Sequence, residues 1–141
     1  CDAWLQLAVR PVAPIVAAAG LAGRRVAVGW GSAGDMVGRR LQREGIEVAL
    51  APFETPDLAL QALLVDNSID ALLVDNVTLR QAQAGGQPVV ALGEPLESIP
   101  SVVVMPTRAR ELQQRVHDGL VHLTESGALR TMEEIWFAQR D

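Results

Sequence analysis

The sequence predicts an α/β fold in which a mostly parallel β-sheet is flanked by helices. Short β-branched segments alternate along the chain with segments of helical periodicity, which is the pattern of βαβ units. One of the strands, Ile69–Val74 (IDALLV), is a nearly continuous apolar run, typical of a parallel strand that is buried on both faces. The 141 residues are 49% apolar and 21% charged, so the chain is long and apolar enough to bury a core.

The first βαβ unit is predicted between residues 25 and 50. Arg25–Trp30 (RVAVGW) is a β-branched run, and the small residues Gly31–Gly34 end it. Asp35–Glu44 has apolar side chains at helical spacing and precedes Gly45, a favourable residue just after a helix. Ile46–Leu50 (IEVAL) alternates apolar and polar residues, as a strand with one buried face does.

The second helix is predicted from a strong start signal. Thr55 can cap the helix, Pro56 fits the first helical position, and Asp57 favours the positive end of the helix dipole. We expect this helix to run to about Asp66, to bury Leu60, Leu63 and Leu64, and to lead into the strand Ile69–Val74.

The second half of the chain continues the alternation. A short helix capped by Asp75 or Asn76 is predicted to run through Ala84, where a Gly-Gly pair ends it. The elements that follow are the strands Pro88–Leu92 and Ser101–Met105 (SVVVM), a long helix from Thr107 or Arg108 to about Ser126, and a last helix Ala128–Phe137.

Charge and composition exclude several classes of function. The net charge is −5, all twelve basic residues are arginine, and no basic run is present, so we expect no nucleic-acid partner. The one cysteine, Cys1, excludes an internal disulfide framework and a cysteine-rich zinc site. His117 and His122 lie five positions apart on a predicted helix and therefore do not share a face. We expect neither a metal site nor a cofactor.

The turn Gly31, Ser32, Ala33, Gly34 is the first candidate binding site. It lies between a predicted strand and a helix N-terminus, where free backbone amides and the helix dipole favour an anion. Small residues there let a ligand approach the backbone. The alternative is a purely structural role, in which Ser32 caps the helix and Asp35 completes a pair that resembles a capping box.

Asp75 is the second candidate. It follows a buried strand at its carboxyl end, where ligands of open α/β sheets bind, and a carboxylate there can pair with a cation. The alternative is that Asp75 only caps the helix that follows. Because both candidates follow parallel strands, we expect them to face one crevice. An anion site opposite a carboxylate suits a zwitterion such as an amino acid.

Three segments also carry a family resemblance. Leu21–Ser32 (LAGRRVAVGWGS) resembles the L-x-G-K-x-V-x-V-x-x-G-[ST]-[ST] segment that opens the second lobe of periplasmic solute-binding proteins of the polar amino-acid family, which have the type II periplasmic-binding-protein fold. Ala59–Leu63 followed by Ile69–Asp75 is similar to the A-L-x-x-L and D-A-x-x-x-D segments of that lobe. Leu112–Gly127 and the chain on to Trp136 resemble the closing helices, so the resemblance covers nearly all of the chain in the family's order.

The resemblance implies roles for individual residues. The turn Gly31–Gly34 would grip the ligand carboxylate with backbone amides and a hydroxyl, although Ala33 replaces the second hydroxyl of the family pattern. Asp75 matches the aspartate that binds the α-ammonium group. Trp30 would either line the cleft or pack in the core, and we favour the core.

The resemblance also implies how the chain is organised. Residues 1–106 would form the second lobe together with both hinge strands, Gln6–Arg10 and Val102–Met105. Residues 107–141 would be C-terminal helices that pack on a first lobe, and that lobe would precede Cys1. Without the first lobe, the apolar side of these helices needs another partner, so we expect self-association or a swapped arrangement.

The function implied is that of the substrate-binding component of an ABC-type importer. It would bind a polar amino acid or a similar small zwitterion by closure of two lobes, without enzymatic chemistry, and would deliver it to a membrane permease. The implied location is periplasmic or extracellular, with a lipoprotein anchor on the full-length protein as one arrangement. Two alternatives remain: a cyclohexadienyl-dehydratase-like enzyme, for which Glu54 is the candidate acid or base, and a ligand-sensing effector domain of a regulator.

Overall fold

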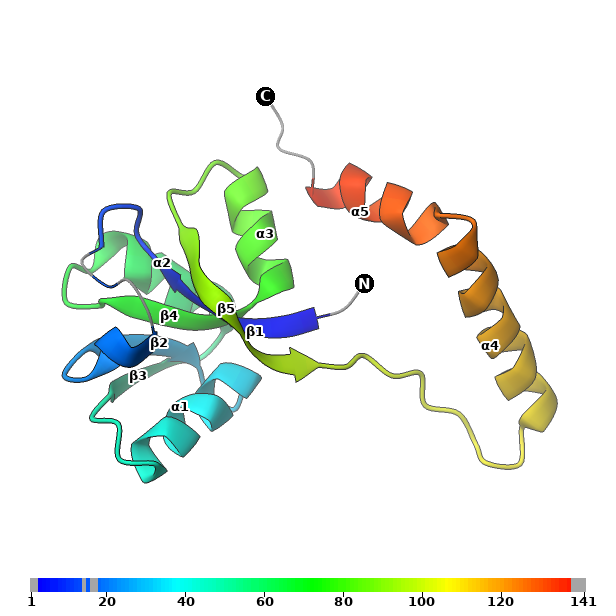
Figure 1. The fold of residues 1–141 in the computed structure, drawn as a ribbon, viewed down its shortest axis with the longest axis horizontal. Coiled ribbons are helices and arrows are strands. Elements are labelled where there is room, and N and C mark those ends of the chain that lie inside the picture. Colours follow the sequence, from blue (N-terminus) through cyan, green and yellow to red (C-terminus); the bar gives the residue numbers. More distant parts are fainter. Residues whose placement is uncertain (1–2, 14, 16–17, 138–141) are drawn as a thin grey trace.

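The computed structural model describes residues 3–13, 15 and 18–137, and these residues contain a five-stranded sheet (Figure 1). The strands are β1 (Ala3–Val9), β2 (Arg25–Gly29), β3 (Ala49–Phe53), β4 (Ala71–Asp75) and β5 (Val90–Ile99), in the order β3-β2-β4-β1-β5. β2 is parallel to β3 and β4, whereas β1 lies between β4 and β5 and is antiparallel to both. The predicted α/β fold is confirmed, with β1 as the strand that opposes the others.

The described helices are a short 3-10 helix η1 (Ala18–Leu21), α1 (Ala33–Arg43), α2 (Pro56–Val65), α3 (Asn76–Ala84), α4 (Arg110–Glu125) and α5 (Ala128–Phe137). Of these, α1, α2 and α3 cover the two faces of the sheet. Side chains of α2 and α3 pack in one apolar cluster with Leu72 and Val74 of β4. Val37 of α1 packs in a second cluster with Leu73. Because alternate residues of β4 enter opposite clusters, this strand is buried on both faces, as its sequence predicts.

Three helices begin directly after the three parallel strands, and each start is set by a side chain that caps it. Ser32 Oγ accepts a hydrogen bond from the Asp35 amide at the start of α1 (3.3 Å). Thr55 Oγ1 accepts one at the start of α2 (3.2 Å), and Asp75 Oδ1 accepts one at the start of α3 (2.8 Å). The three helix N-termini therefore meet at the carboxyl edge of β2, β3 and β4.

The strand predicted at Ile46–Leu50 lies three residues further along, as β3. The residues before β3 complete the end of α1, because the Ile46 amide donates to Leu41 O (3.0 Å). The Gln42 side chain then donates to Val48 O (2.8 Å). The ladder with β2 can begin only where Ala49 N reaches Arg24 O (2.9 Å).

The prediction of a strand at Ser101–Met105, the second hinge strand Val102–Met105 included, is wrong. These residues belong to no strand of the structure, and Val102 and Val104 are exposed. The strand that runs antiparallel to β1 is β5, which extends from Val90 to Ile99 and is longer than the predicted Pro88–Leu92. The Ser101–Met105 run has strand propensity without a neighbouring strand to pair with in the described chain.

The two C-terminal helices lie to one side of the sheet (Figure 1). A segment without helix or strand leads from β5 to α4, which begins at Arg110, two or three residues later than predicted. No residue of α4 is buried, and α4 contacts α5, which in turn contacts α3. Within the described ranges, no helix combines the length and apolarity needed to span a bilayer. Cys1 lies outside the described residues.

Candidate functional site

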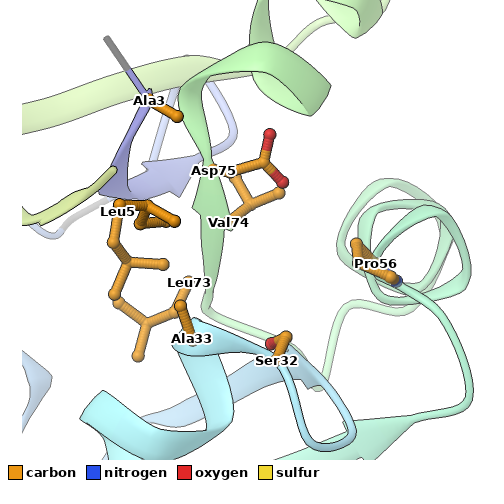
Figure 2. Close-up of a pocket in the computed structure, with 10 residues that line it drawn as sticks. Ala3, Leu5, Ser32, Ala33, Pro56, Leu73, Val74 and Asp75 are labelled. Carbon is orange, nitrogen blue, oxygen red and sulfur yellow. The ribbon is translucent and has the colours of Figure 1, made fainter. Parts of the chain in front are cut away.

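A cavity of about 270 Å³ opens at the carboxyl edge of β2 and β4 (Figure 2). Its polar part consists of the first residues of α1 and the last residue of β4, and its apolar part comes from β1, β4, β5 and α2. The lining residues are Ser32, Ala33, Gly34 and Asp75, together with Ala3, Leu5, Pro56, Leu73, Val74 and Ile99. Three of the four residues of the turn, Ser32, Ala33 and Gly34, therefore line the same cavity as Asp75, whereas Gly31 does not.

The turn before α1 is held by a buried carboxylate. Gly31 has φ +69°, a conformation that glycine adopts without strain, and its amide donates to Asp35 Oδ2 (3.1 Å). Asp35 Oδ1 accepts from Arg39 Nε (2.9 Å), so the buried carboxylate is paired with a guanidinium. Ser32 Oγ in turn accepts from the Asp35 amide, so the cap that the structural alternative predicts is present, and it leaves other groups of the turn open.

Two amides at the start of α1 stay open. In the described part of the chain, no group accepts a hydrogen bond from the amides of Ala33 and Gly34, and both residues line the cavity. The Ser32 hydroxyl accepts from the Asp35 amide, so its own proton remains available to a ligand. Together with the positive end of the helix dipole, these groups favour an anion.

Gly34 positions these open amides. A Cβ at this residue would lie 2.5 Å from Leu73 O, so the first turn of α1 packs directly on the backbone of β4. That close approach places the α1 N-terminus and Asp75, two residues after Leu73, on the same cavity.

Asp75 both caps α3 and lines the cavity. Its Oδ1 accepts from the Thr78 amide and its Oδ2 from Thr78 Oγ1, both at 2.8 Å. Each carboxylate oxygen can accept a further hydrogen bond. None of the ion pairs within the described ranges involves Asp75, so its negative charge has no arginine against it.

Trp30 and Gly31 are not among the residues that line this cavity. Trp30 is 73% exposed, so the expectation that it packs in the core is wrong. Its amide continues the pairing of β2 with β3 by donating to Phe53 O (2.7 Å), and its side chain is left outside. It lines a separate shallow hollow together with Pro52, Phe53 and Glu54.

Sequence reasoning missed the apolar wall of the cavity. Leu5 and Ile99 reach it because β1 pairs with β5, whose residues come more than 80 positions later in the sequence, and no local pattern predicts that pairing. Pro56, which its sequence context predicts at the start of a helix, also lines the cavity. Glu54, the candidate acid or base, is exposed and lies outside the cavity.

The donor set suits binding of a small charged molecule. Open amides and a hydroxyl can bind an anion, and a carboxylate can bind a cation, across one small cavity. Among the residues that the structure describes, no group of three or more His, Cys, Asp or Glu side chains could hold a metal ion.

No protein-family model matches the sequence, and no curated protein matches it. Many solved structures share its fold, however. The second substrate-binding domain of GlnP from Lactococcus lactis, in an open conformation, superposes with a TM-score of 0.76 at 19% identity over 99% of this chain and 60% of that one.

Two further structures show the same likeness. A mutant of ArgBP from T. maritima gives a TM-score of 0.75 at 23% identity, over 98% of this chain and 59% of that one. The ligand-binding core of GluR0 from Nostoc punctiforme, in complex with L-glutamate, gives 0.74 at 24% identity, over 96% and 61%. The chain therefore spans about three fifths of the length of these structures, and its fold is that of a type II periplasmic-binding-protein lobe.

Proposed function

We propose that the cavity binds the α-carboxylate and the α-ammonium group of a polar amino acid or a similar small zwitterion. The observation that carries this proposal is that the open amides of Ala33 and Gly34 and the carboxylate of Asp75 line the same cavity of about 270 Å³. A carboxylate would accept from the amides at the positive end of α1, and an ammonium group would donate to Asp75.

Fewer groups of the turn can donate hydrogen bonds to the ligand carboxylate than the sequence suggests. The Gly31 amide donates to Asp35 and is not free for a ligand. The Ser32 hydroxyl and the amides of Ala33 and Gly34 would therefore hold the carboxylate alone. Ala33 supplies no hydroxyl, so the side chain of Ser32 is the one that can donate from this turn.

We further propose that the chain acts in the substrate-binding component of an ABC-type importer. Residues 1–106 would be one lobe with its hinge, and residues 107–141 would pack on another lobe whose closure traps the ligand. This is supported by the likeness to the GlnP substrate-binding domain, which is longer than this chain, and by the absence of buried residues in α4. Its partner would be a membrane permease, and its location periplasmic or extracellular.

Calorimetry tests the proposal directly. The protein at its full natural length is titrated with a panel of polar amino acids, then with the amide and the deaminated acid of the best ligand. Each analogue lacks one charge that the cavity would hold, so we expect each to bind at least about tenfold more weakly, since one hydrogen bond to a charged group contributes ~1.5–3 kcal/mol. Lack of binding by every amino acid, or equal binding by both analogues, would contradict the proposal.

A further inference from the structure

The surface beside the cavity combines an exposed aromatic ring with a carboxylate. Trp30 is 73% exposed and lines a hollow of about 310 Å³ together with Pro52, Phe53 and Glu54. Glu54 is exposed, and no arginine of the described chain forms an ion pair with it. A tryptophan face next to an uncompensated carboxylate attracts a cation.

Residues that line this hollow lie two positions from residues that line the cavity at the carboxyl edge of β2 and β4. Trp30 stands two residues before Ser32, and Glu54 stands two residues before Pro56, and both later residues line the cavity. The hydrogen bond from the Trp30 amide to Phe53 O fixes the two segments side by side. A ligand whose α-carbon groups occupy the cavity can therefore extend toward Trp30 and Glu54.

The charge distribution favours a cation at this edge. Residues 44–79 contain seven acidic side chains and no arginine, lysine or histidine, and three of the seven lie at or after the carboxyl ends of β3 and β4. Two of the seven, Asp70 and Glu44, form ion pairs with Arg24 and Arg40. At the carboxyl edge of the parallel strands, the carboxylates of Glu54, Asp57 and Asp75 have no ion pair within the described ranges.

The start of α2 does not cancel this negative charge. A helix N-terminus favours anions through its free amides and its dipole. Here Thr55 Oγ1 already accepts from the Leu58 amide, and Asp57 lies in the first turn of α2. Two carboxylates, those of Glu54 and Asp57, therefore lie beside this helix start.

We propose that Trp30 and Glu54 form a subsite for a cationic group at the far end of the ligand, so that the ligand is an amino acid with a guanidinium or ammonium side chain. This rests on the proposed function, which supplies the cavity for the other end of the molecule. The indole face would cover the cation, and Glu54 would pair with it at the rim.

The test compares L-arginine with L-citrulline, which has nearly the same shape and an uncharged side-chain end. The ¹⁵N-labelled protein at its full natural length is titrated with each, and the amide resonances of Ala33 and Gly34 and the indole resonance of Trp30 are followed. We expect both ligands to shift the two amides, and arginine to bind about tenfold more tightly and to shift the Trp30 indole as well.

Matched variants test which side chains cause the preference for arginine over citrulline. Glu54→Gln should lower the arginine-to-citrulline ratio to about threefold, whereas Glu47→Gln, the same change at the other end of β3, should leave it unchanged. Trp30→Leu should also lower the ratio, and Trp136→Leu, an equally exposed tryptophan on α5, should not. The changed side chains are exposed, so all four variants are expected to fold.

The outcomes separate the two proposals. Equal affinity for arginine and citrulline, with both shifting the Ala33 and Gly34 amides, would overturn the cation subsite and leave the proposed function standing. If agmatine, which lacks the carboxylate, shifts Trp30 as strongly as arginine does while no ligand shifts the amides, the subsite stands and the proposed function fails. If nothing shifts either group, both are wrong.

Discussion

At the scale of single residues, Asp75 combines a structural role with a proposed binding role. Its two oxygens hold the Thr78 amide and hydroxyl, and the same carboxylate faces the cavity. The sequence left these two roles as alternatives, because an aspartate after a strand and before a helix fits both. The structure shows that the cap does not remove the side chain from the cavity.

Two substitutions separate these roles of Asp75. Asp75→Asn keeps an oxygen that can accept from the Thr78 amide, so we expect a nearly unchanged free energy of unfolding and at least about tenfold weaker amino-acid binding. Asp75→Ala removes the cap as well and should lower the free energy of unfolding by ~1 kcal/mol. Urea unfolding and calorimetry measure the two effects. Wild-type affinity in Asp75→Asn would exclude the proposed ammonium contact.

Gly34 sets how closely α1 approaches β4. Gly34→Ala places a methyl group 2.5 Å from Leu73 O, a backbone atom that cannot move aside cheaply, so we expect a loss of ~1–3 kcal/mol in the free energy of unfolding. Gly119→Ala in α4 is the matched control, because its Cβ meets nothing within 4 Å and alanine is the better helix former by ~1 kcal/mol. Equal denaturation midpoints for the two variants would contradict the close packing.

The residue types in the sequence predict the polar residues of the candidate site but misplace Trp30. Ser32, Ala33, Gly34 and Asp75 were found because glycine-rich turns and strand-end carboxylates are local signals. Trp30 was misplaced in the core, because its type favours burial while its position, one residue past the end of β2, leaves it outside the sheet.

At the scale of elements, the helix starts were predictable and the long strand β5 was not. Thr55 and Asp75 each accept a hydrogen bond from the amide three residues later, so the local sequence is enough to predict where these helices begin. β5 contains Gly93 and Pro95, which indicate a break. Its ladder with β1 tolerates them because β5 is an edge strand and its register shifts at this point. The pairing partner lies far away in the sequence, so no local pattern predicts it.

An ion pair joins the outer part of β5 to α1. Arg40 and Glu97 lie 2.8 Å apart, with both side chains nearly half exposed. Exposed ion pairs contribute little to protein stability, so we expect Glu97→Gln to lower the free energy of unfolding by only ~0.2–1 kcal/mol at low salt. The loss should be smaller in 1 M NaCl, because salt screens the charges. Glu94→Gln on the same strand is the control and should have no measurable effect. Urea titrations at both salt concentrations measure this, and a loss that is unchanged by salt would rule out the electrostatic origin.

At the scale of the whole molecule, the chain divides into a packed sheet body and a pair of helices with little packing. The body contains the buried clusters, whereas no residue of α4 is buried. Hydrophobic periodicity predicted these helices, but periodicity does not say which surface receives the apolar side. That surface is a tertiary property.

The exposed apolar side chains of α4 and α5 should make the chain associate. Ile135 and Trp136 are 72% and 75% exposed, and Leu112 and Leu120 are about half exposed. We expect the mass measured by sedimentation equilibrium to rise with protein concentration. Ile135→Asp should weaken this association, and Val12→Asp, at an aliphatic residue that is 92% exposed elsewhere, should not. A monomer at all concentrations would contradict the prediction.

The sheet body has its two ends side by side. Ala3 at the start of β1 pairs with Ile99 at the end of β5, so the first and last residues of the segment 3–99 are neighbours in the sheet. Antiparallel partners are only ~4.5–5.5 Å apart at Cα, a gap that a loop of a host protein already spans. The sheet body is therefore suited to insertion into a surface loop of another domain. It is equally suited to circular permutation, in which its ends are joined and new termini are made elsewhere.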